Sequence, residues 1–140
     1  MDQVLIDTNV LVYVHQTDDQ VKQARAIEVV ERLAENKQGR LSTQVLGEFV
    51  RVTTAGKRAT LTIKEARGQL DALIRMFVIF DVTRFTVLEA ARGVQQHQLS
   101  YYDAQIWATA MLRQVPIIYT EDFTDGRVVE GVQFVNPFLH

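Results

Sequence analysis

The chain has 140 residues, 47% of them hydrophobic and 23% charged, which is ordinary for one globular domain, and no apolar run approaches the ~20 residues of a membrane helix. Without cysteine or a secretory signal, disulfides, thiolate metal sites and cysteine nucleophiles are excluded and a cytoplasmic location is expected. With a net charge of −2, the chain lacks the excess of basic residues that is typical of a pure nucleic-acid-binding module. Any nucleic-acid role must therefore rest on local basic patches or on bridging metal ions.

The first predicted elements are a strand and a helix. Residues 4–6 are a short apolar run that stops at Asp7, as a buried strand would. Apolar residues with helical spacing predict a helix over about 20–36, which the polar residues 36–40 end, with Gly39 as the breaker. The face expected to be buried consists of Val21, Ala24, Ile27, Val30 (or Val29), Leu33 and Ala34.

Two further helices are predicted from their caps. Ser42 is a good N-cap for a helix that runs to about Thr54. Thr62, followed three residues later by Glu65, forms a capping box that opens a helix to about Arg75.

The C-terminal half alternates strands with helices. Strands are expected at 77–82, 115–119 and 132–135, and helices at 83–97 and 100–113, capped by Thr83 and Ser100. Strands that alternate with helices predict an α/β fold. We therefore expect a three-layer sandwich, with a central and mainly parallel sheet covered by helices, in a single domain over residues 1–140.

Four acidic residues are candidates for one site at the rim of this sheet. Ligands of open parallel sheets bind beyond the carboxyl ends of the strands, near the point where the strand order reverses. Asp7 ends the first strand, and Asp122 follows the strand at 115–119. Asp103 lies in the first turn of its helix and Glu48 in the middle of another, so all four can meet at that rim.

Clustered carboxylates predict a divalent cation. They repel one another and take up protons unless a cation lies among them. Mg²⁺ and Mn²⁺ prefer oxygen ligands, and one or two such ions can activate water and bind phosphate oxygens. This chemistry needs no side-chain nucleophile, which suits a chain without cysteine.

Each acid also has a simpler interpretation. Asp7 can end a strand and begin a turn, Asp103 can stabilise its helix through the helix dipole, and Asp122 can be a solvated loop residue. Glu48 lies among apolar positions, where an unpaired carboxylate is costly. The neighbouring Gly47 costs about 1 kcal/mol relative to alanine inside a helix, which suggests close approach to the backbone.

Taken together, these segments resemble the PIN-domain family, and within it the VapC toxins of toxin–antitoxin pairs. The matching pieces run along the whole chain in order: residues 4–11 (VLIDTNVL), 41–49 (LSTQVLGEF), 99–104 (LSYYDA), 119–123 (YTEDF) and 131–138. Each piece is weak alone, and the ordered set is specific.

The resemblance implies a set of site residues. Asp7, Glu48 and Asp103 fall on the three firmest acidic positions of the family, and the fourth acid is Asp122, with Glu121 or Asp125 as alternatives. Thr8 and Asn9 fall where the family places small polar residues that support the first acid, and Thr120 is a further candidate for that role.

The resemblance also implies an activity and partners. It implies a ribonuclease that cuts RNA phosphodiesters with Mg²⁺ or Mn²⁺, forms a homodimer and binds a small antitoxin protein near its active site. Arg51, Lys57 and Arg58 are candidates to guide the RNA, or are solvated surface charges.

Three other functions compete with this one. A receiver domain would carry an adjacent acidic pair after its first strand, whereas Asp7 is followed by Thr8 and Asn9. A haloacid-dehalogenase-like phosphatase would carry a second Asp where Asn9 stands. A PIN scaffold kept only to bind RNA or a partner, without turnover, remains the main alternative.

Overall fold

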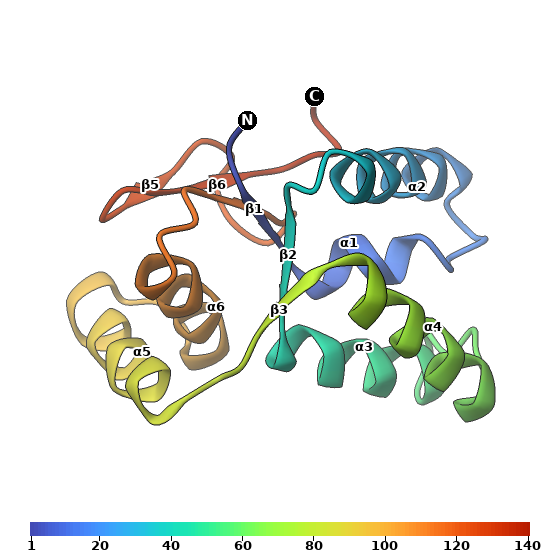
Figure 1. The fold of residues 1–140 in the computed structure, drawn as a ribbon, viewed down its shortest axis with the longest axis horizontal. Coiled ribbons are helices and arrows are strands. Elements are labelled where there is room, and N and C mark those ends of the chain that lie inside the picture. The colour runs from blue at the N-terminus through green and yellow to red at the C-terminus, as the bar shows by residue number, and fades with distance from the viewer.

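Six strands form one sheet in the computed structural model, which describes residues 1–140 (Figure 1). Along the chain the elements are β1 (Val4–Ile6), α1 (Thr8–Tyr13), α2 (Gln20–Glu35), β2 (Gly39–Ser42), α3 (Thr43–Thr54), α4 (Ile63–Met76), β3 (Val78–Phe80), α5 (Arg84–His97), α6 (Tyr101–Leu112), β4 (Ile117–Tyr119), β5 (Val128–Val129) and β6 (Val132–Val135).

The strand order β3-β2-β1-β4-β6-β5 makes β1 the point at which the order of the strands reverses. From β1 the chain builds outward through β2 and β3 on one side, and β4 and β6 continue on the other. All these pairings are parallel, and only β5 runs antiparallel to its neighbour β6. Because Ile6 pairs with Tyr119, the carboxyl ends of β1 and β4 lie side by side.

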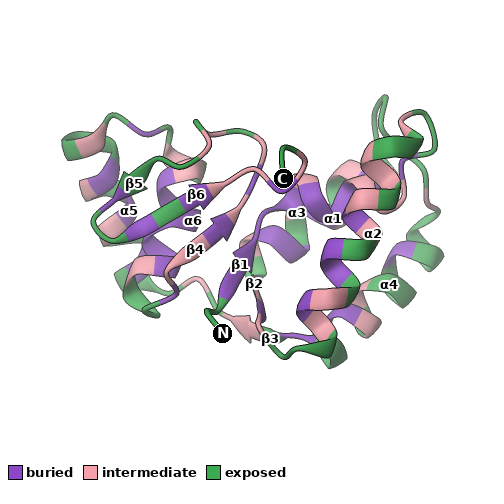
Figure 2. Cartoon of the chain, turned by 90° about the horizontal axis from the view of Figure 1, so that it is seen from above, coloured by how far each residue is buried: buried purple, intermediate pink, exposed green.

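Helices flank the sheet in two groups. In Figure 1, α5 and α6 lie together at the lower left, while α1, α2, α3 and α4 gather on the right. Figure 2 shows β1 in the buried colour and β3, at the sheet edge, in the intermediate colour. This arrangement is the predicted α/β sandwich with a mainly parallel sheet.

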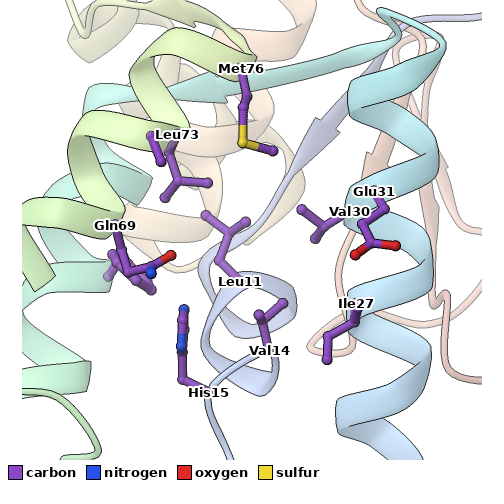
Figure 3. Close-up of a pocket in the computed structure, with 11 residues that line it drawn as sticks. Leu11, Val14, His15, Ile27, Val30, Glu31, Gln69, Leu73 and Met76 are labelled. Atoms are coloured by element: carbon purple, nitrogen blue, oxygen red, sulfur yellow. The ribbon is translucent and has the colours of Figure 1, made fainter. Parts of the chain in front are cut away.

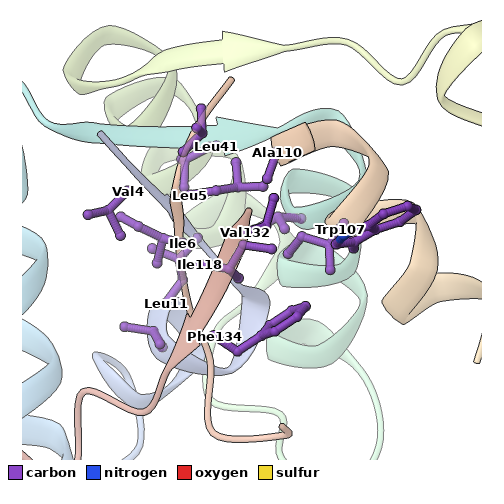
Figure 4. Packing of buried hydrophobic residues seen from close by; sticks show 14 of the residues in the cluster. Val4, Leu5, Ile6, Leu11, Leu41, Trp107, Ala110, Ile118, Val132 and Phe134 are labelled. Atoms are coloured by element: carbon purple, nitrogen blue, oxygen red, sulfur yellow. The ribbon is translucent and has the colours of Figure 1, made fainter. Parts of the chain in front are cut away.

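The core is built on the central strands (Figure 4). Leu5, Ile6 and Ile118 are fully buried, as are the large rings of Trp107 and Phe134. These residues belong to one cluster of 27 buried hydrophobic residues that joins both helix groups to the sheet. The junctions that follow β1 and β4 are therefore anchored in the core.

Several predicted elements are confirmed. Ser42 accepts a hydrogen bond from the backbone N–H of Val45 at the start of α3, and Thr62 with Glu65 forms the expected capping box. Thr83 caps α5 in the same way. Ser100 precedes α6 but makes no side-chain capping bond, so the helix begins where predicted without that bond.

Other predictions were wrong. Gly39 does not break a helix, because it begins β2, where an added Cβ would clash with the ring of Phe77. The short strands β2 and β5 and the helix α1 were not predicted. In α2, Val21 and Ala24 are exposed, and the buried residues are Ala26, Val29, Val30 and Leu33.

No helix of the chain combines the length and the apolarity needed to cross a bilayer.

Candidate active site

Asp7 lies at the junction of β1 and α1, where its carboxylate caps the helix. One oxygen, Oδ1, accepts a 2.7 Å hydrogen bond from the backbone N–H of Thr8, and Oδ2 accepts a 2.8 Å bond from the hydroxyl of Thr120. The residue is only 8% exposed. Burial raises the pKa of Asp7 to about 6, and the nearby carboxylates of Asp122 and Glu48 add to the rise, against the lowering effect of the two hydrogen bonds.

Glu48 reaches the same place from the middle of α3. Its Oε2 accepts a 3.0 Å hydrogen bond from the hydroxyl of Thr8, and its Oε1 accepts a 3.0 Å bond from the side-chain amide of Gln44. Thr8 therefore bonds to both Asp7 and Glu48, through its backbone N–H and its hydroxyl respectively. This explains why a helix that packs through Phe49 carries a carboxylate next to its buried face.

Asn9 joins Asp7 to Asp122. Its amide nitrogen lies 3.4 Å from Oδ2 of Asp7, 3.2 Å from the hydroxyl oxygen of Thr120 and 3.1 Å from Oδ2 of Asp122. The Thr120 oxygen also accepts a 3.1 Å hydrogen bond from the backbone N–H of Asp122. Thr8, Asn9 and Thr120 thus all bond to Asp7, the acid that they were expected to support.

Asp122 and Asp103 complete the acidic group. Partial burial raises the pKa of Asp122, and repulsion from the carboxylates of Glu121 and Asp103 contributes, whereas the hydrogen bond from Asn9 and the charge of Arg58 lower it. Asp103, in the first turn of α6, is therefore close enough to Asp122 to affect its ionisation. Of the three basic residues suggested by the sequence, Arg58 is the one whose charge lowers the pKa of Asp122.

The other two candidates for the fourth acid are engaged elsewhere. Glu121 forms a 2.8 Å ion pair with Lys22 and accepts a 2.8 Å hydrogen bond from the hydroxyl of Tyr13. Asp125 accepts a 2.8 Å hydrogen bond from the backbone N–H of Asn136 and contacts the ring of His140 at 2.9 Å. Asp122, which no cation pairs, is the one of the three that faces Asp7 through Asn9.

The donor set fits a hard divalent cation. Carboxylate oxygens of Asp7, Glu48 and Asp122 converge at one edge of the sheet, and neither lysine nor arginine forms an ion pair with them. As the side chains lie, no three acidic or histidine residues are arranged to hold one ion directly. Mg²⁺ prefers oxygen ligands, usually keeps several of its own waters and is bound through one or two carboxylates.

A relay of amides that the sequence analysis missed leads to Glu48. The hydroxyl of Tyr101 donates to Gln105 at 2.8 Å, the amide of Gln105 donates to Gln44 at 3.0 Å, and the amide of Gln44 donates to Glu48. The spacing of Gln44, one helical turn before Glu48, was the available signal. Nothing in the sequence placed Gln105 beside them.

An apolar cavity lies away from the acids. It has a volume of about 170 Å³ and lies among α1, α2, α3 and α4, between apolar side chains that include Leu11, Ile27 and Met76 (Figure 3). None of the four candidate acids lines it.

The fold is shared with solved toxin structures. A toxin–antitoxin complex from Klebsiella pneumoniae has a TM-score of 0.70 at 21% identity, over 96% of this chain and 98% of that chain. VapC20 of Mycobacterium tuberculosis, described as a sarcin-ricin loop cleaving toxin, has a TM-score of 0.66 at 20% identity, over 94% of this chain and 99% of that chain.

A third similar structure is the DNA-bound VapBC of Salmonella typhimurium, with a TM-score of 0.67 at 14% identity, over 96% of this chain and 97% of that chain. No curated protein matches the sequence. The family model of the PIN domain matches residues 4–124, which include all four candidate acids. The chain therefore belongs to the PIN-domain family.

Proposed function

We propose that the chain is a metal-dependent endoribonuclease that hydrolyses RNA phosphodiester bonds. The observation that carries this proposal is that the carboxylates of Glu48 and Asp122 lie close to a buried Asp7 that has no basic partner, with Asp103 close to Asp122. A buried, uncompensated acidic group is costly unless a cation joins it. Membership of the PIN-domain family supports the same activity.

Asp7, Glu48, Asp103 and Asp122 would hold Mg²⁺ or Mn²⁺. When bound, the ion supplies Lewis acidity toward the scissile phosphate and lowers the pKa of water. The chain's own residues do the positioning: Thr8 holds Asp7 and Glu48, and Asn9 holds Asp122 near Asp7. The hydrogen bonds that Asp7 and Asp122 accept lower the pKa of each carboxyl against the effect of burial, and so favour the ionised form that binds a cation.

The biological role proposed is that of the toxin in a type II toxin–antitoxin pair in the cytoplasm. Similar structures are described as a toxin–antitoxin complex and as VapBC assemblies, which supports a cognate antitoxin protein as partner. RNA as substrate and a second copy of the chain as a dimer partner are carried over from the family resemblance.

A cleavage assay tests the activity. The purified chain should cut single-stranded RNA in the presence of Mg²⁺ or Mn²⁺, and EDTA should stop it. Asp103→Asn should be inactive although its circular dichroism matches that of the wild type. Binding of RNA without turnover, under every metal condition, would instead support a silent PIN scaffold.

A further inference from the structure

A second hollow lies directly beside Glu48. It is an open cleft of about 530 Å³ between α3 and α6, and its lining includes Gln44, Gly47, Glu48, Arg51, Tyr102 and Gln105. Glu48 therefore belongs both to the acidic group and to this cleft. Anything bound in the cleft lies next to the site proposed for phosphodiester cleavage.

The side-chain amides in the cleft already form hydrogen bonds within the protein. Gln105 donates to Gln44 at 3.0 Å, and Gln44 donates to Glu48 and, at 3.1 Å, to the backbone carbonyl of Tyr102. These bonds tie α3 to α6 and fix the shape of the cleft. Of the other groups that line the cleft, the backbone at Gly47, the ring of Tyr102 and the guanidinium of Arg51 can meet a ligand.

Gly47 has no structural reason to be glycine. It lies in the interior of α3, where glycine is less favourable than alanine, and it does not have a positive φ. The sequence suggested close approach to its backbone, yet an added Cβ would meet nothing of the chain within 4 Å. The bare backbone instead widens the cleft, which points to a ligand that approaches it closely.

Tyr102 and Arg51 supply two kinds of contact. Tyr102 is 65% exposed at the cleft, and its ring is held edge-on against Tyr101 with centroids 5.3 Å apart. Arg51 is exposed and forms no ion pair. Unpaired bases stack on aromatic rings, and basic side chains bind the phosphates between them.

We propose that this cleft binds one unpaired nucleotide of the substrate strand, adjacent to the scissile phosphate. The base stacks on Tyr102, the backbone of the strand passes Gly47, and Arg51 binds a phosphate. The inference rests on the proposed ribonuclease function and adds to it a position for one base of the substrate, stacked on Tyr102 beside Glu48.

Filling the cleft is the sharpest test. Gly47→Leu places a side chain in the cleft, and Gly68→Leu is a matched control, because Gly68 is also exposed inside a helix, has nothing within 4 Å of an added Cβ and lines no part of the cleft. Both changes are made in an Asp7→Asn background to prevent turnover. Binding of a fluorescein-labelled single-stranded RNA of mixed sequence is measured by anisotropy, together with thermal unfolding.

Gly47→Leu should weaken this binding about tenfold without lowering the unfolding temperature, and Gly68→Leu should bind as its parent does. Equal affinity of the two variants would overturn the subsite. So would a weakening that light scattering traces to altered self-association, because the cleft would then be an interface between copies of the chain.

A second pair of variants tests the ring in the active protein. Tyr102→Ala should raise KM about tenfold with little change in kcat, and Tyr102→Trp should restore it, because only stacking is needed. Phe85→Ala is the control, since Phe85 is similarly exposed at 64% on α5. An unchanged KM in Tyr102→Ala would refute the role of the ring.

The two proposals fail differently. If the wild type cleaves RNA while Gly47→Leu and Tyr102→Ala behave as their controls do, the nucleotide subsite falls and the ribonuclease stands. If the wild type cleaves no RNA under any metal condition, the ribonuclease falls and the subsite falls with it.

Discussion

The hydroxyl of Thr8 donates a 3.0 Å hydrogen bond to Glu48, 40 residues further along the chain. The backbone N–H of Thr8 donates at the same time to Asp7, so a single residue sets the separation of two carboxylates from different elements. Thr8 is only 6% exposed, so the packing around it restricts its position.

Removal of this hydroxyl should impair cleavage without unfolding the chain. Thr8→Val keeps the volume and the backbone donor but removes one of the two hydrogen bonds to Glu48. We expect activity to fall roughly 10- to 100-fold, as when a group that orients a metal ligand is lost. Initial rates on single-stranded RNA measure this. Thr8→Ser, which retains the hydroxyl, should stay near wild type, and equal losses in both variants would contradict the role.

The stability of the metal-free protein should depend on the ionisation of Asp7. The pKa of Asp7 is raised from 3.8 to about 6, so the folded state favours the protonated carboxyl. The stability that protonated Asp7 contributes is therefore fully present below about pH 4 and is lost as the pH rises through 6. The difference between the two pKa values corresponds to about 3 kcal/mol. Asp7→Asn should therefore be more stable than the wild type near pH 8, by up to about this amount, and should lose the advantage near pH 4.

Urea denaturation in EDTA at both pH values measures this difference. Asp7→Asn should also lack RNA cleavage, which separates its effect on stability from its effect on catalysis. If the wild type is as stable as Asp7→Asn at every pH, the ionised carboxylate of Asp7 does not destabilise the fold.

A divalent cation should offset the destabilisation that ionised Asp7 causes. Mg²⁺ or Mn²⁺ at about 100 times its Kd should stabilise the wild type by about 2.7 kcal/mol. Asp7→Asn should gain much less, and Ca²⁺ offers a comparison between cations. Thermal unfolding with and without EDTA gives the measurement, and equal shifts for both proteins would place the cation elsewhere.

Asp122 and Glu121 should differ in what they contribute. Asp122→Asn removes a carboxylate of the acidic group and should reduce cleavage at least tenfold. Glu121→Gln breaks the ion pair with Lys22 but leaves the acidic group intact, so it should cleave RNA at nearly the wild-type rate. The reverse order of activities would reassign the fourth acid to Glu121.

Gly39 should be intolerant of even a methyl group. Its Cβ would clash with the ring of Phe77, so Gly39→Ala should destabilise the protein by about 1–3 kcal/mol through overpacking. Gly68→Ala is the control, because an exposed helical glycine should gain about 1 kcal/mol when it is replaced by alanine. Urea denaturation of both variants compares them.

Local patterns in the sequence were sufficient for most helices and for the central strand. The caps Ser42, Thr62 and Thr83 act within one helical turn, so they are visible without a fold. The apolar run before Asp7 predicts a buried strand for the same reason. The short elements α1, β2 and β5 were missed because their stability comes from packing and pairing with distant segments rather than from their own residues.

The sequence also supplied the identities of the candidate acids, but only the tertiary structure determined how they are arranged. Strand order places β1 beside β4, which brings Asn9 and Thr120 between Asp7 and Asp122. Packing of α3 on α1 brings Glu48 to Thr8, and packing of α3 near α6 creates the cleft at Gly47. Hydrogen bonds and Coulomb forces act over a few ångströms, so pairs up to 113 residues apart in sequence could not be identified before the chain was folded.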